Sequence, residues 1–442
     1  MIGKHIVRRI AVVLAVALGA LATTSGAAFA GGELPSQWDP RQVAVNHDPE
    51  NTFLLRPGQI IAGPGDEADV QRVLTGWQPG EQHPFGLTVF MRAPQTSDPA
   101  REVLDAIARV RKATAGRPQG PARVAPNYVF VGESINFYGE PRIQGGPGSS
   151  VRLAARPAAL PLRTTNPADG KGVKIAVLDT GMFDHEWLTN VQRAPYSDDV
   201  WDVEHDGYAD AESGHGTFIA GLIAQVAPSA TVYAAKVLDS HGVGDDLNVA
   251  AVMERLPADV DVVNLSLGGY TDKDTAPLGI TTAVQQMAQK NVAVVAAAGN
   301  NSSSRPFWPA AYRPVLSVGA VESSAEKWTR ASYSNYGAWV DATARGSNLQ
   351  STFGRGKTKV AQGLTISPTD PTIAFNGWAA WDGTSFATPI AAALIARTMT
   401  RAGLGSPATA EQQLLATTPL APQPDFPHAV VLDELDGLPD PA

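Results

Sequence analysis

After residue 170 the chain alternates between short apolar runs and longer segments that have one apolar face. The apolar runs predict buried strands at Lys174 to Leu178, Thr231 to Val237, Val260 to Ser266, Val292 to Ala297 and Val315 to Ala320. Helical patterns lie between them, at Gly216 to Ala224, Asp245 to Arg255 and Ile280 to Lys290. This alternation predicts an α/β fold of three layers, in which helices cover both faces of a mostly parallel central sheet. Functional residues of such sheets gather at the carboxyl ends of the strands.

The region before residue 140 has a different pattern, with short strand-like runs and amphipathic segments. The strand-like runs are Phe53 to Leu55, Leu87 to Met91 and Val124 to Phe130, and the amphipathic segments are Asp66 to Trp77 and one that starts at Asp98-Pro99. These patterns predict a small α+β domain over residues 31–138. Gly, Pro, Ala, Ser and Arg dominate residues 139–170, which indicates a linker or processing segment. The main domain then covers residues 171–422, followed by a C-terminal tail over residues 423–442.

The first thirty residues have the three parts of a secretory signal peptide. Lys4, Arg8 and Arg9 form a positive segment, Ile10 to Ala22 an apolar segment, and Ala28-Phe29-Ala30 a small-residue cleavage motif. The apolar segment is short for a membrane span, and no second long apolar run follows it. We therefore expect an exported protein that is released rather than anchored.

Composition narrows the possible partners. With 442 residues, 44% of them hydrophobic, the chain can hold two domains and a large core. A net charge of −9 disfavours nucleic acid as a partner, because nucleic-acid binding needs a basic face. The sequence has no cysteine, so an exported protein of this kind relies on its core or on bound ions for stability.

Three residues of the main domain have side chains that suit nucleophilic catalysis. Asp179 directly follows a predicted strand, His215 stands between glycines at a predicted helix start, and Ser385 precedes an alanine-rich helix. Each alone has a commoner explanation, as a turn residue, a surface histidine or a helix cap. Together they supply an acid, a base and a nucleophile in the order Asp, His, Ser, one of the known orders of the catalytic triad. The Gly-x-Ser-x-Gly pattern of α/β-hydrolases is broken here by Ala387.

Asn300 adds a fourth element, because it ends a predicted strand where its amide could donate to an oxyanion together with the Ser385 backbone N–H. The blocks around these four residues resemble those of the subtilisin-like serine peptidases, over roughly residues 172–400. The resemblance implies a three-layer subtilisin-like fold in which Asp179 orients His215 and His215 acts as base and then acid. It also implies that Ser385 attacks the peptide carbonyl to form an acyl-enzyme and that Asn300 is the oxyanion donor.

Further segments resemble the substrate-binding and regulatory parts of that family. The residues matched to the substrate-binding edges are Ser266, Leu267, Gly268, Gly242, Val243 and Gly244. Small residues at these positions let the main chain of an extended peptide come within hydrogen-bond distance. The N-terminal domain, above all Val124 to Phe130, resembles the family's inhibitory propeptide. That resemblance implies a zymogen, and we expect autocatalytic cleavage between about Glu133 and Ala154.

The calcium loop that many family members insert after the histidine has no room here, because the predicted helix runs directly into Val226-Ala227-Pro228. The acidic run Asp202 to Asp210 resembles the start of a calcium loop, although Ser213 stands where a bidentate Glu is expected. A solvated acidic loop is the alternative reading of this run. We expect no required cofactor and assign no metal ligand, while a structural calcium ion stays open.

These observations predict a secreted, monomeric serine endopeptidase that is made as an autoprocessed zymogen. Its expected partners are a polypeptide substrate and its own propeptide, with neither nucleic acid nor a membrane anchor. Two alternatives remain open, a narrow-specificity maturation protease for one exported partner and a non-catalytic binding protein on a protease scaffold. The second alternative is disfavoured because all four catalytic positions hold competent residues.

Overall fold

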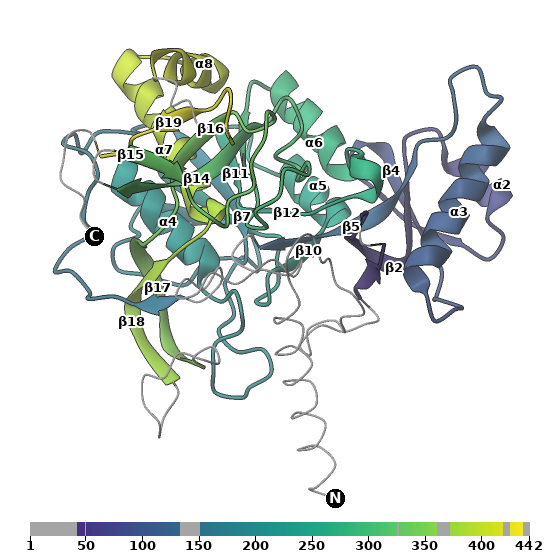
Figure 1. Cartoon of the computed structure of the whole chain (residues 1–442), viewed down its shortest axis with the longest axis horizontal. Helices are drawn as coiled ribbons and strands as arrows, with labels where there is room; N and C mark the ends of the chain where they lie inside the picture. Colours follow the sequence, from purple (N-terminus) through teal and green to yellow (C-terminus); the bar gives the residue numbers. More distant parts are fainter. Residues whose placement is uncertain are drawn as a thin grey trace, which may run out of the picture.

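A computed structural model of the chain describes residues 42–48, 50–132, 151–324, 327–359, 372–418 and 425–435. The predicted signal peptide lies outside these residues, as do residues 133–150 of the predicted processing region. The described residues form a small N-terminal unit, residues 42–132, beside a larger main body (Figure 1). Among the described residues, no helix is both long and apolar enough to cross a bilayer.

The main body is built on a sheet of nine strands within the described residues, in the order β19-β16-β14-β13-β11-β7-β9-β8, with β15 paired to β14. All pairs are parallel except β14 with β15. The bounds are β7 (Lys174–Asp179), β8 (Val191–Arg193), β9 (Thr231–Lys236), β11 (Val262–Leu265), β13 (Ala293–Ala297), β14 (Leu316–Ser324), β15 (Lys327–Arg330), β16 (Ala342–Arg345) and β19 (Val430–Leu432). Residues 430–432, assigned to a tail from the sequence, thus form the edge strand of this sheet.

Helices cover both faces of the sheet, because successive apolar residues of each strand point to opposite faces. Ile175 and Val177 of β7 share one core with α4 (His215–Val226) and α7 (Thr384–Ala402), which α8 (Pro407–Thr417) joins on the outside. Ala176 and Leu178 share the other core with α5 (Asp246–Glu254) and α6 (Leu278–Gln289). The three-layer α/β fold predicted from the sequence is therefore confirmed.

A β-hairpin on the α4 side was not predicted. It consists of β17 (Leu349–Lys359) and β18 (Thr372–Trp381), and β6 (Arg152–Leu153) from the predicted linker pairs with β18. Helix α4 approaches this hairpin so closely that a Cβ on Gly221 would lie 2.2 Å from the hydroxyls of Ser351 and Thr352. Glycine at this position therefore allows the hairpin to form one wall behind the helix that begins at His215.

The N-terminal unit is an α+β arrangement whose sheet extends into the main body. Its elements are β1 (Ala44–Asn46), β2 (Phe53–Ala62), α2 (Glu67–Val73), β3 (Gln78–His83), η1 (Pro84–Gly86), β4 (Leu87–Met91), α3 (Pro99–Thr114) and β5 (Val124–Gly132). Helix α3 starts as the sequence predicts, with the Asp98 side chain accepting a hydrogen bond from the Arg101 backbone N–H (2.9 Å). The strand order is β10-β5-β2-β4-β3, with β1 on β2 and β12 on β5.

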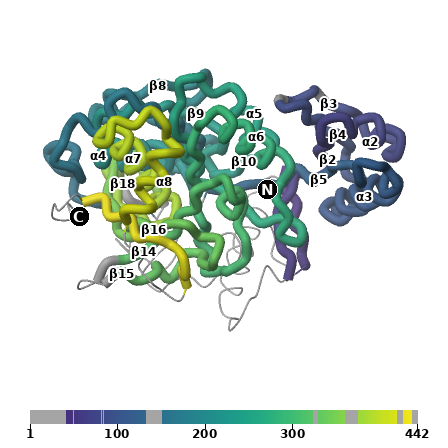
Figure 2. Tube along the Cα trace, turned by 90° about the horizontal axis from the view of Figure 1, so that it is seen from above, coloured from purple at the N-terminus to yellow at the C-terminus, as the bar shows by residue number. Residues whose placement is uncertain are grey.

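Two of these strands belong to the main body, β10 (Val243–Asp245) and β12 (Leu267–Gly268). The strand β5 runs antiparallel to both and is buried along its whole length. Seen from above, α2 and α3 lie on the side of the N-terminal unit that faces away from the main body, and β5 runs from this unit into the main body (Figure 2). The edges that β5 occupies lie next to the carboxyl end of β7, where the candidate site is found.

Candidate active site

Asp179 and His215 are brought into contact by the sheet and the helix that follows it. Asp179 is the last residue of β7, and His215 is the first residue of α4. The Asp179 Oδ1 atom lies 2.8 Å from His215 Nδ1 and also accepts the Thr180 backbone N–H at 2.8 Å. Both side chains are buried. This contact fixes the orientation of the imidazole ring and leaves its Nε2 atom directed away from the carboxylate.

The backbone around His215 requires glycine on both sides. Gly214 has a φ of +89°, and a Cβ there would lie 2.5 Å from the Phe353 ring. A Cβ on Gly216 would lie 2.1 Å from the Gly181 carbonyl oxygen. The glycines that flanked His215 in the sequence therefore mark a real close approach between the start of α4 and the end of β7.

Ser385 and Asn300 meet at the start of α7. Ser385 is the second residue of this helix and is fully buried. The Asn300 Oδ1 atom accepts hydrogen bonds from both the backbone N–H and the hydroxyl of Thr384, each at 2.9 Å. These bonds fix the amide so that its Nδ2 atom, the donor, faces the site rather than Thr384. Ser266 joins the group through its hydroxyl, which donates to the Ser385 carbonyl at 2.7 Å.

Four buried polar atoms of the triad residues and Asn300 have no hydrogen-bond partner among the described residues. They are Asp179 Oδ2, His215 Nε2, Ser385 Oγ and Asn300 Nδ2. Buried polar atoms are paired in the large majority of cases, so a group of unpaired ones at a helix N-terminus indicates a place for a reacting molecule. A base, a hydroxyl and an amide donor are the groups that acyl transfer needs.

Two buried carboxylates next to these residues were missed by sequence reasoning. The Asp199 Oδ2 atom accepts hydrogen bonds from the Thr180 hydroxyl and the Gly214 backbone N–H, both at 2.9 Å, and so ties together the segments that carry Asp179 and His215. Burial raises the pKa of Asp199 to about 7. Glu212 is fully buried, with its Oε2 atom 3.9 Å from His215 Nε2. The only sign of Glu212 in the sequence is that it stands three residues before His215.

The pKa of His215 is raised above its ordinary value. Burial alone would lower it, but the adjacent Asp179 carboxylate and, after it, the Glu212 carboxylate favour the protonated ring and outweigh burial. A raised pKa makes the unpaired Nε2 atom a better proton acceptor, and the ring can act as a base at any pH above that pKa.

The predicted substrate-binding residues line the groove that β5 occupies. On one side Val243, Gly244 and Asp245 of β10 pair with Val131, Phe130 and Val129, and the Gly132 backbone N–H donates to the Gly242 carbonyl at 2.8 Å. On the other side Leu267 and Gly268 of β12 pair with Gly132 and Val131. Both edges thus bind an extended chain through backbone hydrogen bonds, and the extended chain is a segment of the same polypeptide.

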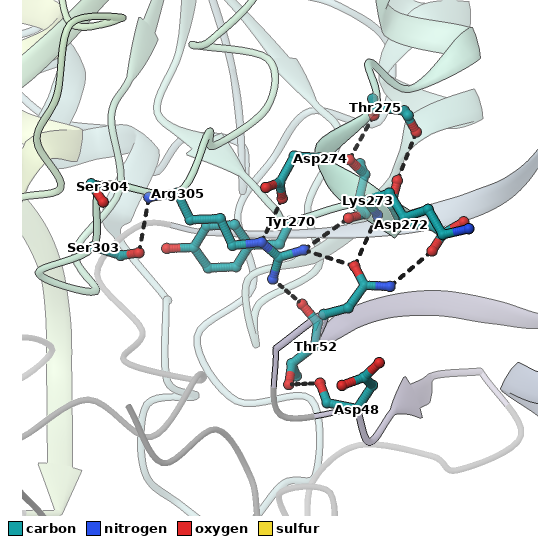
Figure 3. Close-up of polar contacts among 12 residues, drawn as sticks. Asp48, Thr52, Tyr270, Asp272, Lys273, Asp274, Thr275, Ser303, Ser304 and Arg305 are labelled. Atoms are coloured by element: carbon teal, nitrogen blue, oxygen red, sulfur yellow. Dashed lines mark hydrogen bonds and ion pairs between the residues drawn. The ribbon is translucent and has the colours of Figure 1, made fainter. Parts of the chain in front are cut away.

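A second contact holds the N-terminal unit against the main body (Figure 3). The Arg305 guanidinium donates to the Thr52 carbonyl at 2.6 Å and to the Asp274 carboxylate at 2.5 Å, and it lies over the Tyr270 ring at 4.6 Å. The neighbouring Asn51 side chain donates to the Asp272 carboxylate at 2.8 Å. η2 (Asp272–Asp274) and Arg305 together form a polar anchor for the turn before β2.

The carboxylates of the acidic run before His215 make contacts within the protein. The Asp202 carboxylate accepts the backbone N–H groups of Asp206 (3.0 Å) and Gly207 (2.6 Å), and Glu204 pairs with His241 Nε2 at 2.6 Å. The Asp202 and Glu204 carboxylates therefore have different protein partners. Glu204, Asp210 and His241 could offer one ligand atom each to a metal ion, within 4.8 Å of one another. Calcium binding by this run stays a prediction.

Comparison with known proteins gives concordant matches. The Peptidase_S8 model, described as the subtilase family, matches residues 170–432. Subtilisin BL of Lederbergia lenta is 38% identical over 194 residues, which are 42% of this chain and 67% of that protein. Subtilisin E of Bacillus subtilis (strain 168) is 32% identical over 270 residues, which are 58% of this chain and 63% of that protein.

Among solved structures, the chain is similar to fervidolysin from Fervidobacterium pennivorans, described as a keratinolytic enzyme related to subtilisin. The TM-score is 0.58 at 19% identity, and the match covers 87% of this chain and 61% of that one. At this identity the match concerns the fold. The chain therefore spans about two thirds or less of the length of each protein named here.

Proposed function

The chain belongs to the subtilase family of serine endopeptidases, and we propose that it hydrolyses peptide bonds with Asp179, His215 and Ser385 as its catalytic triad. In this proposal His215 Nε2 takes the proton of the Ser385 hydroxyl as Ser385 Oγ attacks the peptide carbonyl. The Asp179 carboxylate holds the ring by its Nδ1 atom and stabilises the imidazolium that forms. The same imidazolium then protonates the leaving amine, and water hydrolyses the acyl-enzyme by the reverse sequence.

The oxyanion of each tetrahedral intermediate would be held by Asn300 Nδ2 and the Ser385 backbone N–H. The two bonds from Thr384 to Asn300 Oδ1 support this role, because they orient the amide before substrate arrives. The observation that carries the proposal is the 2.8 Å contact between Asp179 and His215, with an unpaired imidazole nitrogen, hydroxyl and amide donor buried beside it.

We further propose that the chain is exported and made as a zymogen whose N-terminal unit is an inhibitory propeptide. The position of β5 supports this, because β5 occupies both edges with which an extended substrate would pair. Cleavage after β5, between about Glu133 and Ala154, would free these edges. The segment from Arg152 onward would stay on the main body, since Arg152 pairs with Asp382 and β6 pairs with β18.

Labelling with a fluorophosphonate probe tests the catalytic part. Wild-type protein freed of its N-terminal unit is expected to be labelled at Ser385, and the Ser385→Ala variant is expected to remain unlabelled. Absence of label on the freed wild type would overturn the hydrolase proposal. Autoprocessing is tested separately with purified full chain, where Ser385→Ala should stay uncleaved; cleavage at the wild-type rate would show that another protease performs this step.

A further inference from the structure

The turn that carries Asn300 is held by a buried side chain from a distant loop. This side chain is Asn335, which lies between β15 and β16 and is fully buried. Its Oδ1 atom accepts the backbone N–H groups of Asn301 (3.0 Å) and Ser303 (2.9 Å), and its Nδ2 atom donates to the Ala298 carbonyl (2.9 Å). These hydrogen bonds therefore fix the chain on both sides of Asn300.

The Asn335 amide uses its full hydrogen-bonding capacity. Such an amide has two N–H donors and an oxygen that accepts two hydrogen bonds. The second N–H donates to the Tyr270 hydroxyl at 3.2 Å. Tyr270 is held in turn by the Arg305 guanidinium over its ring at 4.6 Å (Figure 3) and by the perpendicular Phe307 ring at 5.1 Å. The amide can therefore not rotate without the loss of several hydrogen bonds.

The backbone just before Asn300 is shaped to fit this amide. Gly299 has a φ of +102°, and a Cβ at this position would lie 2.3 Å from Asn335 Nδ2. The Asn335 backbone N–H also donates to the Gly299 carbonyl at 2.8 Å. Glycine thus supplies both the left-handed conformation and the space that the amide needs.

Two side chains thus fix the two parts of Asn300. Thr384 fixes the side-chain amide through its bonds to Oδ1, and Asn335 fixes the backbone from which that amide extends. The position of the Nδ2 donor depends on both. An oxyanion donor has to be in place before the negative charge develops. A displacement of about 1 Å at a reacting centre can lower the rate about 10²-fold.

We propose that Asn335 is a positioning residue for peptide hydrolysis, which holds the Asn300 backbone so that Nδ2 faces the oxyanion. Asn335 acts through Asn300 and does not itself bind the reacting atoms. This inference rests on the proposed peptidase function, in which Asn300 is the oxyanion donor, and it adds a residue outside the triad. Most buried polar side chains only stabilise the fold, so the test has to separate that role from an effect on one donor.

Asn335→Ala is the first test. The full chain is folded, its N-terminal unit is removed with an added protease, and active sites are counted with the fluorophosphonate probe. Loss of four side-chain hydrogen bonds around Asn300 should lower kcat about 10- to 100-fold and change KM less than about twofold. An unchanged kcat, or a rise in KM alone, would overturn the proposal.

A double-mutant cycle then asks whether the effect passes through Asn300. In an Asn300→Ala background the donor is already absent, so Asn335→Ala should lower kcat by less than about twofold. The same factor in both backgrounds would mean that Asn335 acts independently of Asn300, and the positioning role would be wrong.

Ser317→Ala is the matched control, because Ser317 is also a fully buried polar residue that links two segments. Its hydroxyl accepts the Asp341 backbone N–H at 3.0 Å and donates to the Trp339 carbonyl at 2.8 Å. This variant should lower the thermal stability and leave kcat unchanged in both backgrounds. A loss of kcat as large as that of Asn335→Ala would show that any buried polar group has this effect, which contradicts the assignment to Asn335.

Tyr270→Phe is a milder variant for the case in which Asn335→Ala does not fold. It keeps the ring and removes the hydroxyl that accepts from Asn335 Nδ2 (3.2 Å) and donates to Asn301 Oδ1 (3.3 Å). We expect kcat to fall about two- to tenfold when Asn300 is present, the range for one hydrogen bond, and to stay unchanged in the Asn300→Ala background. Equal factors in the two backgrounds would again overturn the proposal.

The positioning role and the peptidase function fail in different ways. Wild type that is labelled and loses kcat on Asn300→Ala, but shows additive effects of Asn335→Ala, refutes only the role of Asn335. Full kcat in Asn300→Ala refutes the donor role of Asn300 and this inference with it, while the triad stands. Wild type that takes up no label and cleaves no peptide refutes the peptidase function itself.

Discussion

The reacting centre and the groove edges lie side by side beneath β5, but they are built in opposite ways. At the centre, hydrogen bonds within the main body fix the side chains of Asp179, His215 and Asn300 and leave their functional atoms unpaired. At the edges, the backbone groups of β10 and β12 are paired, and β5 supplies the partner. The centre is therefore complete before a peptide arrives, whereas the edges are completed only by a bound strand.

This difference predicts two kinds of variant. Substitutions at the centre should change the rate of the chemical step and leave docking of the N-terminal unit unaltered. Substitutions where the two units touch should change how firmly β5 is held and leave the chemical step unaltered. The predictions below test this separation, from the largest expected effect to the smallest.

Asp179→Asn should give the largest effect and should be confined to the centre. The amide keeps the size of the carboxylate but favours the wrong tautomer of His215, so kcat/KM should fall about 10⁴-fold. The measurement uses peptide hydrolysis by protein freed of its N-terminal unit with an added protease. Hydrogen exchange of the Gly132 amide in the uncleaved full chain should stay as in the uncleaved Ser385→Ala protein. A large increase in that exchange would show that centre and edge are not separable.

Asn300→Ala should reduce kcat about 10² to 10³-fold with little change in KM, the loss typical of removing one oxyanion donor. Thr384→Val is the matched control, because it removes one of the two hydrogen bonds to Asn300 Oδ1 and keeps the Nδ2 donor. Its loss should be several times smaller. Equal losses in the two variants would mean that Asn300 acts by holding the start of α7 rather than as a donor.

The sequence predicted the secondary structure around the centre better than the short strands of the edges, and the contrast above explains why. Strands β7, β11 and β13 are runs of apolar residues whose signal is local, so their positions were predicted to within a few residues. The centre follows, because its residues stand at strand and helix ends next to glycines that the backbone requires. By contrast, β10 and β12 contain only three and two residues and owe their extended pairing to β5, more than a hundred positions away.

The two buried carboxylates also could not be predicted from the sequence, because their burial depends on contacts between distant segments. Asp199 and Glu212 lie in polar loops whose local pattern is that of a solvated surface, and only the fold reveals that they are buried against the ends of β7 and α4. For the acidic run around Asp202 both readings from the sequence stay open. Its spacing is similar to that of a calcium loop, and the Asp202 side chain accepts two backbone N–H groups of its own loop.

Arg305→Ala tests the edge side of the comparison. Loss of its charged hydrogen bonds to Thr52 and Asp274 should weaken docking of the N-terminal unit. In an uncleavable Ser385→Ala background, exchange of the Val131 and Gly132 amides should become about 10 to 100 times faster. The exposed Arg313 offers a matched control, since Arg313→Ala should leave the exchange unchanged. If Arg305→Ala also leaves it unchanged, β5 is held by strand pairing and core packing alone.

Glu212→Gln should give the smallest change in rate, and Glu212 lies next to both regions. Its Oε2 atom lies 3.9 Å from His215 Nε2 and would lie 3.2 Å from a Cβ on Gly132 of β5. Peptidase activity requires unprotonated His215, so activity falls as the pH drops below the His215 pKa, and the Glu212 carboxylate raises that pKa. Removing the charge should therefore move the acid-side fall in activity to lower pH. The exposed Glu254 provides the control, since Glu254→Gln should not move it.

The size of this shift should depend on whether a peptide covers Glu212. Glu212 is fully buried in the structure, where β5 occupies the groove. We expect that removal of β5 admits water, which screens the Glu212 charge, and that a bound peptide strand excludes this water again. The pH profile of kcat reports the enzyme–substrate complex and that of kcat/KM reports the free enzyme, so Glu212→Gln should shift the kcat profile more. Equal shifts in both profiles would mean that Glu212 acts on His215 regardless of the strand, and it would then belong to the centre alone.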